Sequence, residues 1–155
     1  MRGRVHPMSD SAAPVLPHRD GERAVLLRIP AKAEYIALCR LALTGLGRVR
    51  EIGDDTMADL KLALTEAVSN SIRHAYGPNG SGHAEITYEL RLDRLGIEVV
   101  DDGEGFDPEE TPAFEGDELS EGGLGIAIIR TIADDFTIQS RPGVRGSRLR
   151  FVKHL

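Results

Sequence analysis

Hydrophobic and polar residues recur with different periods along the chain, and each period predicts a different element. A short apolar run at 24–29 ends at Pro30, which predicts a first strand at the edge of a sheet, where proline is tolerated. Apolar residues at helical spacing then predict a helix over 31–46, and Gly45 and Gly47 are the signal that ends it. The pattern therefore begins with a strand followed by a helix.

A second helix is predicted from Asp54 or Asp55, either of which can cap it, to about Tyr76. The other predicted elements are two pairs of strands separated by a loop and a helix: 84–92 and 95–100, the loop 107–122, the helix 124–133, and 136–140 and 147–153. This order predicts an α+β fold, a two-layer sandwich in which helices cover one face of a mostly antiparallel sheet.

Composition limits the organisation and the partners of the chain. We expect 24–155 to form one domain and 1–23, which lacks any period, to be a disordered or weakly ordered tail. With 19 basic and 25 acidic residues the net charge is −6, which disfavours nucleic acid and anionic membranes as partners. No apolar stretch is long enough to span a membrane, and the single cysteine, Cys39, cannot form an intramolecular disulfide. We therefore expect a cytoplasmic protein in which Cys39 packs as a small hydrophobic residue.

Glu66, Asn70 and His74 stand four residues apart on the second predicted helix and form one polar stripe opposite its apolar face. A solvated face explains such a stripe by default. Asparagine, however, is a poor residue for the middle of a helix, which indicates some other role. Its amide oxygen suits Mg²⁺, and a carboxylate one turn earlier can accept a proton from a nucleophile. Both interpretations stay open at this point.

Two glycine-rich segments follow the predicted strands and loop. In the first, Asp101 precedes Gly103 and Gly105 at the end of a strand; in the second, Gly123 and Gly125 open a helix. A tight turn or a hinge explains either segment alone, although amides at a helix start without Cβ obstruction also bind phosphate. The spacing excludes an EF-hand, a Rossmann fingerprint and a P-loop.

Taken in order, these segments resemble the nucleotide-binding boxes of the GHKL ATPase superfamily, which has the Bergerat fold. The helix at 65–76 resembles its N box, 101–105 its first glycine box and 123–125 its second, with 107–122 as the ATP lid. The sequence of 65–76, TEAVSNSIRHAY, is most similar to the corresponding segment of the anti-sigma-factor serine kinases of bacterial stress and sporulation switches.

The resemblance implies a role for each candidate site residue. Glu66 would be the catalytic residue that orients or deprotonates the hydroxyl of the protein substrate, and Asn70 would bind the Mg²⁺ that bridges the ATP phosphates. Asp101 would accept a hydrogen bond from the adenine amino group, with support from Ser147. The other ATP-binding residues that the resemblance implies are Arg73, His74, Gly103, Gly105, Gly123, Leu124 and Gly125.

The resemblance also implies a function and partners. A protein of this family sequesters a sigma factor as a homodimer and uses ATP and Mg²⁺ to phosphorylate an antagonist protein on serine or threonine. Many relatives carry a basic residue just before the second glycine box, whereas Ser120 and Glu121 stand there in this chain, after an acidic loop. This departure leaves an alternative, a non-catalytic regulatory module of the same fold that binds nucleotide to capture a partner.

Overall fold

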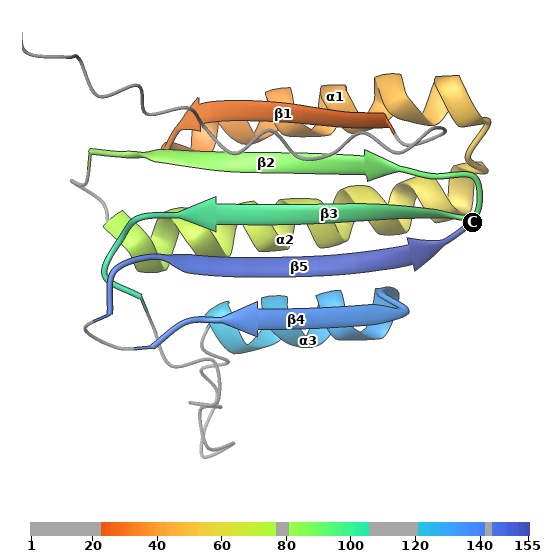
Figure 1. Ribbon diagram of the computed structural model, residues 1–155. Coiled ribbons are helices and arrows are strands. Elements are labelled where there is room, and N and C mark those ends of the chain that lie inside the picture. The colour runs from red at the N-terminus through yellow and green to blue at the C-terminus, as the bar shows by residue number, and fades with distance from the viewer. Residues whose placement is uncertain (1–22, 77–80, 106–120, 142–143) are drawn as a thin grey trace, which may run out of the picture.

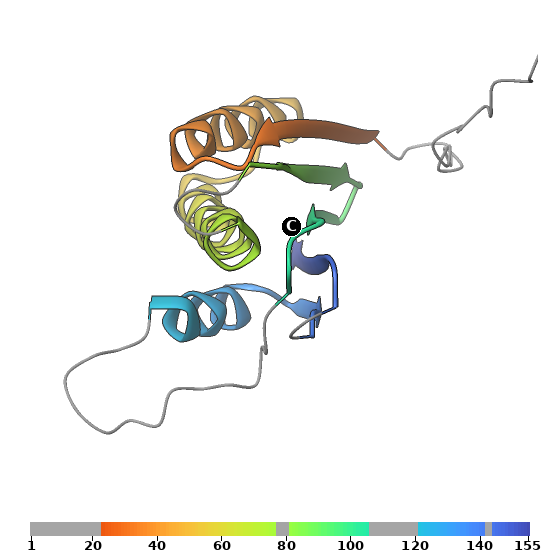
Figure 2. The same cartoon turned by 90° about the vertical axis from the view of Figure 1, so that its left-hand side faces the viewer.

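The protein is built from two layers, a five-stranded antiparallel sheet and three α-helices packed on one of its faces (Figures 1 and 2). The computed structural model describes residues 23–76, 81–105, 121–141 and 144–155. The strands are β1 (Arg23–Pro30), β2 (His83–Leu90), β3 (Arg94–Asp101), β4 (Asp135–Gln139) and β5 (Ser147–His154). The helices are α1 (Ile36–Arg50), α2 (Asp54–Tyr76) and α3 (Glu121–Ile132), with a 3-10 turn at Ala33–Tyr35 before α1. The predicted α+β sandwich is confirmed.

The sheet has the strand order β1-β2-β3-β5-β4, so β1 lies at one edge, as the proline at its end predicts (Figure 1). The last strand in sequence, β5, is inserted between β3 and β4. In the antiparallel register of β3 and β5, Asp101 pairs with Ser147. The topology thus places two candidate site residues that are far apart in the sequence side by side at one end of the sheet.

The core lies between the helices and one face of the sheet. Alternate residues of the inner strands are fully buried there, among them Ile86, Tyr88 and Ile97. Helix α2 contributes Leu60 and Leu64 from its apolar face, also fully buried. Because α2 lies behind the middle of the sheet and is anchored along its length (Figure 1), the polar residues near its C-terminal end are held in a fixed position.

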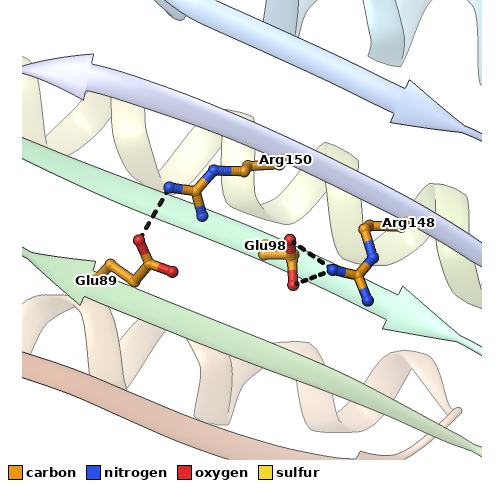
Figure 3. A network of polar contacts seen from close by, with 4 residues as sticks. All are labelled: Glu89, Glu98, Arg148 and Arg150. Atoms are coloured by element: carbon orange, nitrogen blue, oxygen red, sulfur yellow. Dashed lines mark hydrogen bonds and ion pairs between the residues drawn. The ribbon is translucent and has the colours of Figure 1, made fainter. Parts of the chain in front are cut away.

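The opposite face of the sheet carries a layer of ion pairs (Figure 3). Arg148 of β5 pairs with Glu98 of β3 at 3.3 Å, and Arg150 pairs with Glu89 of β2 at 2.9 Å. The Arg150 guanidinium reaches Glu89 across Gly96 of β3, where a Cβ atom would lie 3.1 Å from its Nη2. Pairs this close to solvent contribute little to stability, so this face is held mainly by the backbone ladder beneath it.

Cys39 packs in the core between α1 and the sheet, as predicted. Its side chain is fully buried, and burial raises the pKa of the thiol to about 11. The hydroxyl of Tyr88 donates a hydrogen bond to the backbone oxygen of Cys39 at 2.7 Å. The thiol therefore stays protonated at neutral pH, which makes it a structural residue rather than a reactive one.

The end predicted for the first helix is wrong. Gly45 and Gly47 lie inside α1, which continues to Arg50 and ends at Glu51 in the left-handed conformation. Gly47 is buried, and a Cβ atom there would collide with the side chain of Met57 near the start of α2. The glycine lets the two helices approach closely, so its reason is tertiary packing rather than a stop signal.

Two predicted features lie largely outside the described residues. These are the tail at 1–23, of which only Arg23 is described, and the loop at 107–122, of which only the last two residues are described. Helix α3 begins at Glu121, earlier than the predicted 124, so the second glycine box lies within its first turns. Among the helices of the described ranges, none is long and apolar enough to cross a membrane.

Candidate functional site

Asp101, the last residue of β3, is a buried carboxylate that accepts hydrogen bonds from three parts of the chain. The hydroxyl of Ser71 on α2 donates to its Oδ2 at 2.5 Å, and the hydroxyl of Ser147 at the start of β5 donates to the same oxygen. The amide of Gly103 donates to Oδ1 at 3.0 Å. Because all three donors belong to the fold, the carboxylate has a fixed orientation before any ligand binds.

A cavity of about 650 Å³ opens beside Asp101. The end of β3, the start of β5 and the connection from β4 to β5 line it. Val100, Ile138 and Val144 supply apolar wall, while Asp101 and Ser147 supply hydrogen-bonding atoms. An apolar cavity with a few fixed polar groups is the usual form of a small-molecule site, and this one suits a flat ring that carries a hydrogen-bond donor at its edge.

The first glycine box is packed against the turn that connects β4 and β5. The amide of Gly146 donates to the carbonyl of Gly103 at 2.6 Å. Gly105 has a φ of 77°, and a Cβ atom there would collide with the carbonyl oxygen of Arg141 and lie 2.7 Å from that of Val144. Residue 105 therefore has to be glycine, whereas Gly103 is held through its backbone oxygen. The partners in these contacts, Arg141, Val144 and Gly146, line the cavity.

Asn70 on α2 is only 3% exposed, and its Oδ1 atom is buried with no hydrogen-bond partner among the described residues. Leaving a buried polar atom unpaired costs about 1–3 kcal/mol. Such an atom indicates a ligand that completes it, and an amide oxygen is a hard donor of the kind that Mg²⁺ accepts. The residue present therefore fits the metal that the sequence predicts.

Glu66 lies one helical turn before Asn70 and contacts α3 at Gly125. The side chain of Glu66 is half-buried, and Gly125 is buried. A Cβ atom at residue 125 would lie 2.7 Å from Oε2 of Glu66. The absence of a side chain in the second glycine box thus makes room for this carboxylate, a contact that the spacing along the sequence does not reveal.

The other predicted site residues lie around these two clusters. Gly123 is half-buried and Leu124 is 47% exposed in the first turns of α3. Arg73 is exposed on α2 and takes part in a polar interaction. The side chain of His74 lies outside the described residues.

The structure brings most of the predicted residues together in two groups. Asp101, Gly103, Gly105 and Ser147 form the cavity end, and Glu66, Asn70 and Gly125 form the α2–α3 end. Sequence reasoning missed Ser71, which joins the two groups, because its helical position looked like part of the apolar face. The signal that could have found it is a second hydroxyl residue at a buried position beside Asn70.

The two-layer fold and this site define an ATPase domain of the histidine kinase type. The family described as histidine kinase-like ATPase domain matches residues 29–153, and the chain belongs to that family. The resemblance inferred from the three motifs is therefore confirmed.

Curated relatives narrow the assignment to serine-protein kinases. The chain is 36% identical over 126 residues to serine-protein kinase RsbW of Bacillus velezensis, covering 76% of this chain and 79% of that protein. It is 37% identical over 136 residues to serine-protein kinase RsbW of Staphylococcus epidermidis, covering 82% and 86%.

A solved structure supports the fold. The crystal structure of the RsbU and RsbW domains of a Mycobacterium tuberculosis protein aligns with a TM-score of 0.61 and 17% identity, over 84% of this chain and 31% of that one. At that identity the likeness bears on the fold alone.

Proposed function

We propose that this chain binds ATP between its two site clusters and transfers the γ-phosphoryl group to a serine or threonine of a partner protein. The observation that carries the proposal is the buried oxygen of Asn70, which has no hydrogen-bond partner among the described residues and lies one turn from a carboxylate that α3 makes room for. A metal ligand next to a proton acceptor is the pair of groups that phosphoryl transfer to a hydroxyl needs.

The relatives support kinase activity directly. The chain is a protein serine kinase by its family, since serine-protein kinases match it at 36–37% identity over most of its length. They do not favour the alternative of a non-catalytic binding module. The acidic loop before the second glycine box remains a departure in the sequence, but the pair of Glu66 and Asn70 is intact.

The cavity end would recognise the base. Among the described residues Gly103 alone donates to Oδ1 of Asp101, which leaves an acceptor position that suits the 6-amino group of adenine. The apolar walls at Val100 and Ile138 suit the faces of the ring. Gly103 and Gly105 hold the wall of the cavity against the β4–β5 turn. This arrangement supports ATP as the phosphoryl donor.

The α2–α3 end would carry the chemistry. Asn70 would hold Mg²⁺ through Oδ1, and Mg²⁺ bound there would neutralise negative charge on the phosphates. Glu66 would be the catalytic residue: its carboxylate accepts the proton of the attacking hydroxyl, while the oxygen of that hydroxyl forms the new bond to phosphorus and ADP leaves. Gly123, Leu124 and Gly125 would lie beside the phosphates at the start of α3, where helix amides favour negative charge. Arg73 and His74 would complete the predicted ATP-binding set.

The proposed partners are a sigma factor, which the chain sequesters, and an antagonist protein, which it phosphorylates. We therefore also propose that the protein regulates transcription in the cytoplasm, where ATP and sigma factors are both present. The kinase activity is supported by the relatives, which are named serine-protein kinases. The regulatory partners are our inference from the sequence of the motif at 65–76.

A homodimer is proposed as the working form. Support comes from the edge formed by β1 and α1, where apolar side chains are exposed: Leu26 is 62% exposed, Leu38 47% and Leu41 65%. An edge strand beside such residues is suited to contact with a second copy. Light scattering should give the mass of a dimer for the wild type and of a monomer for Leu41→Glu.

Phosphotransfer to a partner tests the proposal. The protein, labelled ATP and Mg²⁺ are incubated with proteins that co-purify from the native cell, and phosphoserine or phosphothreonine is located by mass spectrometry. We expect labelling that falls about 100-fold or more in Glu66→Gln, while ATP binding persists. The matched control is Glu98→Gln on the open face of the sheet, which should label normally. Equal labelling by wild type and Glu66→Gln would contradict the role of Glu66, and ATP binding without transfer to any partner would favour the non-catalytic alternative.

A further inference from the structure

Ser71 is a buried polar residue to which no sequence motif assigns a role. It lies on α2 directly after Asn70 and is 5% exposed. Its hydroxyl donates to Oδ2 of Asp101 at 2.5 Å, across 30 residues of sequence and from one layer of the sandwich to the other. A hydroxyl so placed connects the helix of the proposed metal ligand to the strand that ends in the proposed base-binding acid.

The acceptor capacity of Asp101 shows what this hydrogen bond does. An ionised carboxylate has about four acceptor positions, two on each oxygen. Ser71 and Ser147 both donate to Oδ2, so that oxygen is filled, while Gly103 takes one position on Oδ1. Counting the donors among the described residues, the acceptor position left for a ligand is therefore on Oδ1.

The hydrogen bonds to Asp101 also determine which hydrogen-bonding role the two serine hydroxyls have left. Each hydroxyl has a single proton, and both protons point at Asp101, so their oxygens present only lone pairs to their surroundings. Ser147 lines the cavity. The polar end of the cavity consequently accepts hydrogen bonds at both Oδ1 of Asp101 and Oγ of Ser147. A ring with an exocyclic amino group satisfies it, whereas a ring with a carbonyl oxygen at that position meets acceptors only.

We propose that Ser71 is a positioning residue for base recognition: it fills Oδ2 of Asp101, so that the carboxylate presents one acceptor on Oδ1 to the 6-amino group of adenine. The proposal rests on the proposed function in that it takes ATP as the ligand. Ser71 does not line the cavity, so it acts through Asp101. Without its hydroxyl, Oδ2 regains a free acceptor position in a buried place, and the carboxylate is free to rotate toward a different donor.

The position of Ser71 next to Asn70 gives the contact a second consequence. Both residues lie in one turn of α2, and Ser71 ties that turn to the end of β3. A shift of Asp101 on binding the base would therefore act on the same turn that holds Oδ1 of Asn70, for which the described part of the chain supplies no partner. The residues that would recognise the base and the residue that would bind the metal are thereby connected through one turn of α2.

Nucleotide discrimination tests the proposal. Calorimetry would give dissociation constants for ATP, for GTP and for purine riboside triphosphate, which has hydrogen in place of the 6-amino group. In Ser71→Ala we expect ATP to bind about fivefold more weakly and the purine analogue to bind as it does to wild type, because only the amino contact is lost. The KM for ATP should rise by the same factor, with kcat unchanged at saturation.

A matched pair of variants separates the hydroxyl from the space it fills. Ser71→Thr keeps the hydroxyl and Ser71→Val replaces it by a methyl group in nearly the same volume, so any packing strain is common to both. We expect Ser71→Thr to keep the wild-type ratio of ATP to analogue affinity and Ser71→Val to lose it. Thr44→Ala, which removes a hydroxyl bonded to a backbone oxygen on α1, is the control and should leave the ratio unchanged.

Three results would overturn the proposal: an unchanged ratio in folded Ser71→Ala, an equal loss of affinity for ATP and the analogue, or the same ratio in Ser71→Thr and Ser71→Val. Failure of the proposed function looks different. In that case the wild type itself would bind ATP no better than the analogue, or would not bind nucleotide, and the role of Ser71 would fall with it.

Discussion

The two ends of the site differ in what satisfies their buried polar groups. At the cavity end, Asp101 accepts hydrogen bonds from Ser71, Ser147 and Gly103, all of them groups of the chain. At the α2–α3 end, Oδ1 of Asn70 is equally buried, and no described residue donates to it or binds it. The cavity end is therefore positioned by the chain itself before a ligand arrives, whereas we propose that a ligand satisfies the buried oxygen at the α2–α3 end.

The two ends also differ in what surrounds their glycines. A side chain at Gly105 would strike the backbone oxygens of Arg141 and Val144, which cannot move without the turn between β4 and β5. A side chain at Gly125 would meet the carboxylate end of Glu66, which can rotate away. From this contrast we infer that the cavity end would select its ligand through backbone contacts, while the α2–α3 end would use side chains that a small change can displace.

The largest expected effect on stability is at the rigid end. Gly105→Ala places a side chain at a φ of 77° and against backbone oxygens, so we expect the free energy of unfolding to fall by about 3 kcal/mol. Urea denaturation measures it. Gly45→Ala is the matched control, because nothing lies within 4 Å of a Cβ atom there and the residue is within α1. That variant should be stabilised by up to about 1 kcal/mol. Equal stability of Gly105→Ala and wild type would show that the contacts of Gly105 with Arg141 and Val144 do not make this end of the site rigid.

A smaller effect is expected at Gly125, and it should appear in the rate rather than in stability. In Gly125→Ala the new Cβ atom would displace the carboxylate of Glu66, so phosphotransfer should fall about tenfold, or about 1.4 kcal/mol. The melting temperature should stay close to that of wild type, since the displaced group is the end of a side chain. A variant that melts much lower and retains its rate per folded molecule would reverse the proposed contrast between the two glycines.

The smallest effect is expected on the open face of the sheet, away from both ends. Glu98→Gln removes the ion pair with Arg148, whose side chain is 55% exposed, and should change the free energy of unfolding by about 0.5 kcal/mol or less. Nucleotide affinity should not change. A clear loss of affinity in this variant would extend the site to the far face of the sheet.

Elements with a simple period were predictable from the sequence. The segment 84–92 alternates between apolar and polar residues and 95–100 follows it after a turn, and the structure has these strands as β2 and β3. The family followed from the order of three motifs, and it is confirmed. Local pattern succeeds here because each of these features is determined by residues that are neighbours in the sequence.

Features that depend on distant contacts were not predictable. Gly47 signals a helix end by its local preference, yet it stands inside α1 because Met57 needs its space. Ser71 looks like one more small residue of a buried helix face until the fold brings Asp101 beside it. Gly146, at a φ of 88°, appears as an ordinary turn residue, but its amide holds the first glycine box. Each of these roles is set by a partner that is remote in the sequence or by the packing of two elements.

The dependence of ATP binding on Mg²⁺ tests whether Asn70 holds the metal while Asp101 and Ser147 bind the base. Calorimetry would give the dissociation constant of ATP with Mg²⁺ and with a chelator, for wild type, Asn70→Ala and Ser147→Ala. We expect Mg²⁺ to strengthen ATP binding to wild type and to Ser147→Ala. This gain should disappear in Asn70→Ala, whose affinity in chelator should stay that of wild type. An Asn70→Ala variant that keeps the full gain from Mg²⁺ would contradict the division of the site into a base-reading end and a ligand-completed end.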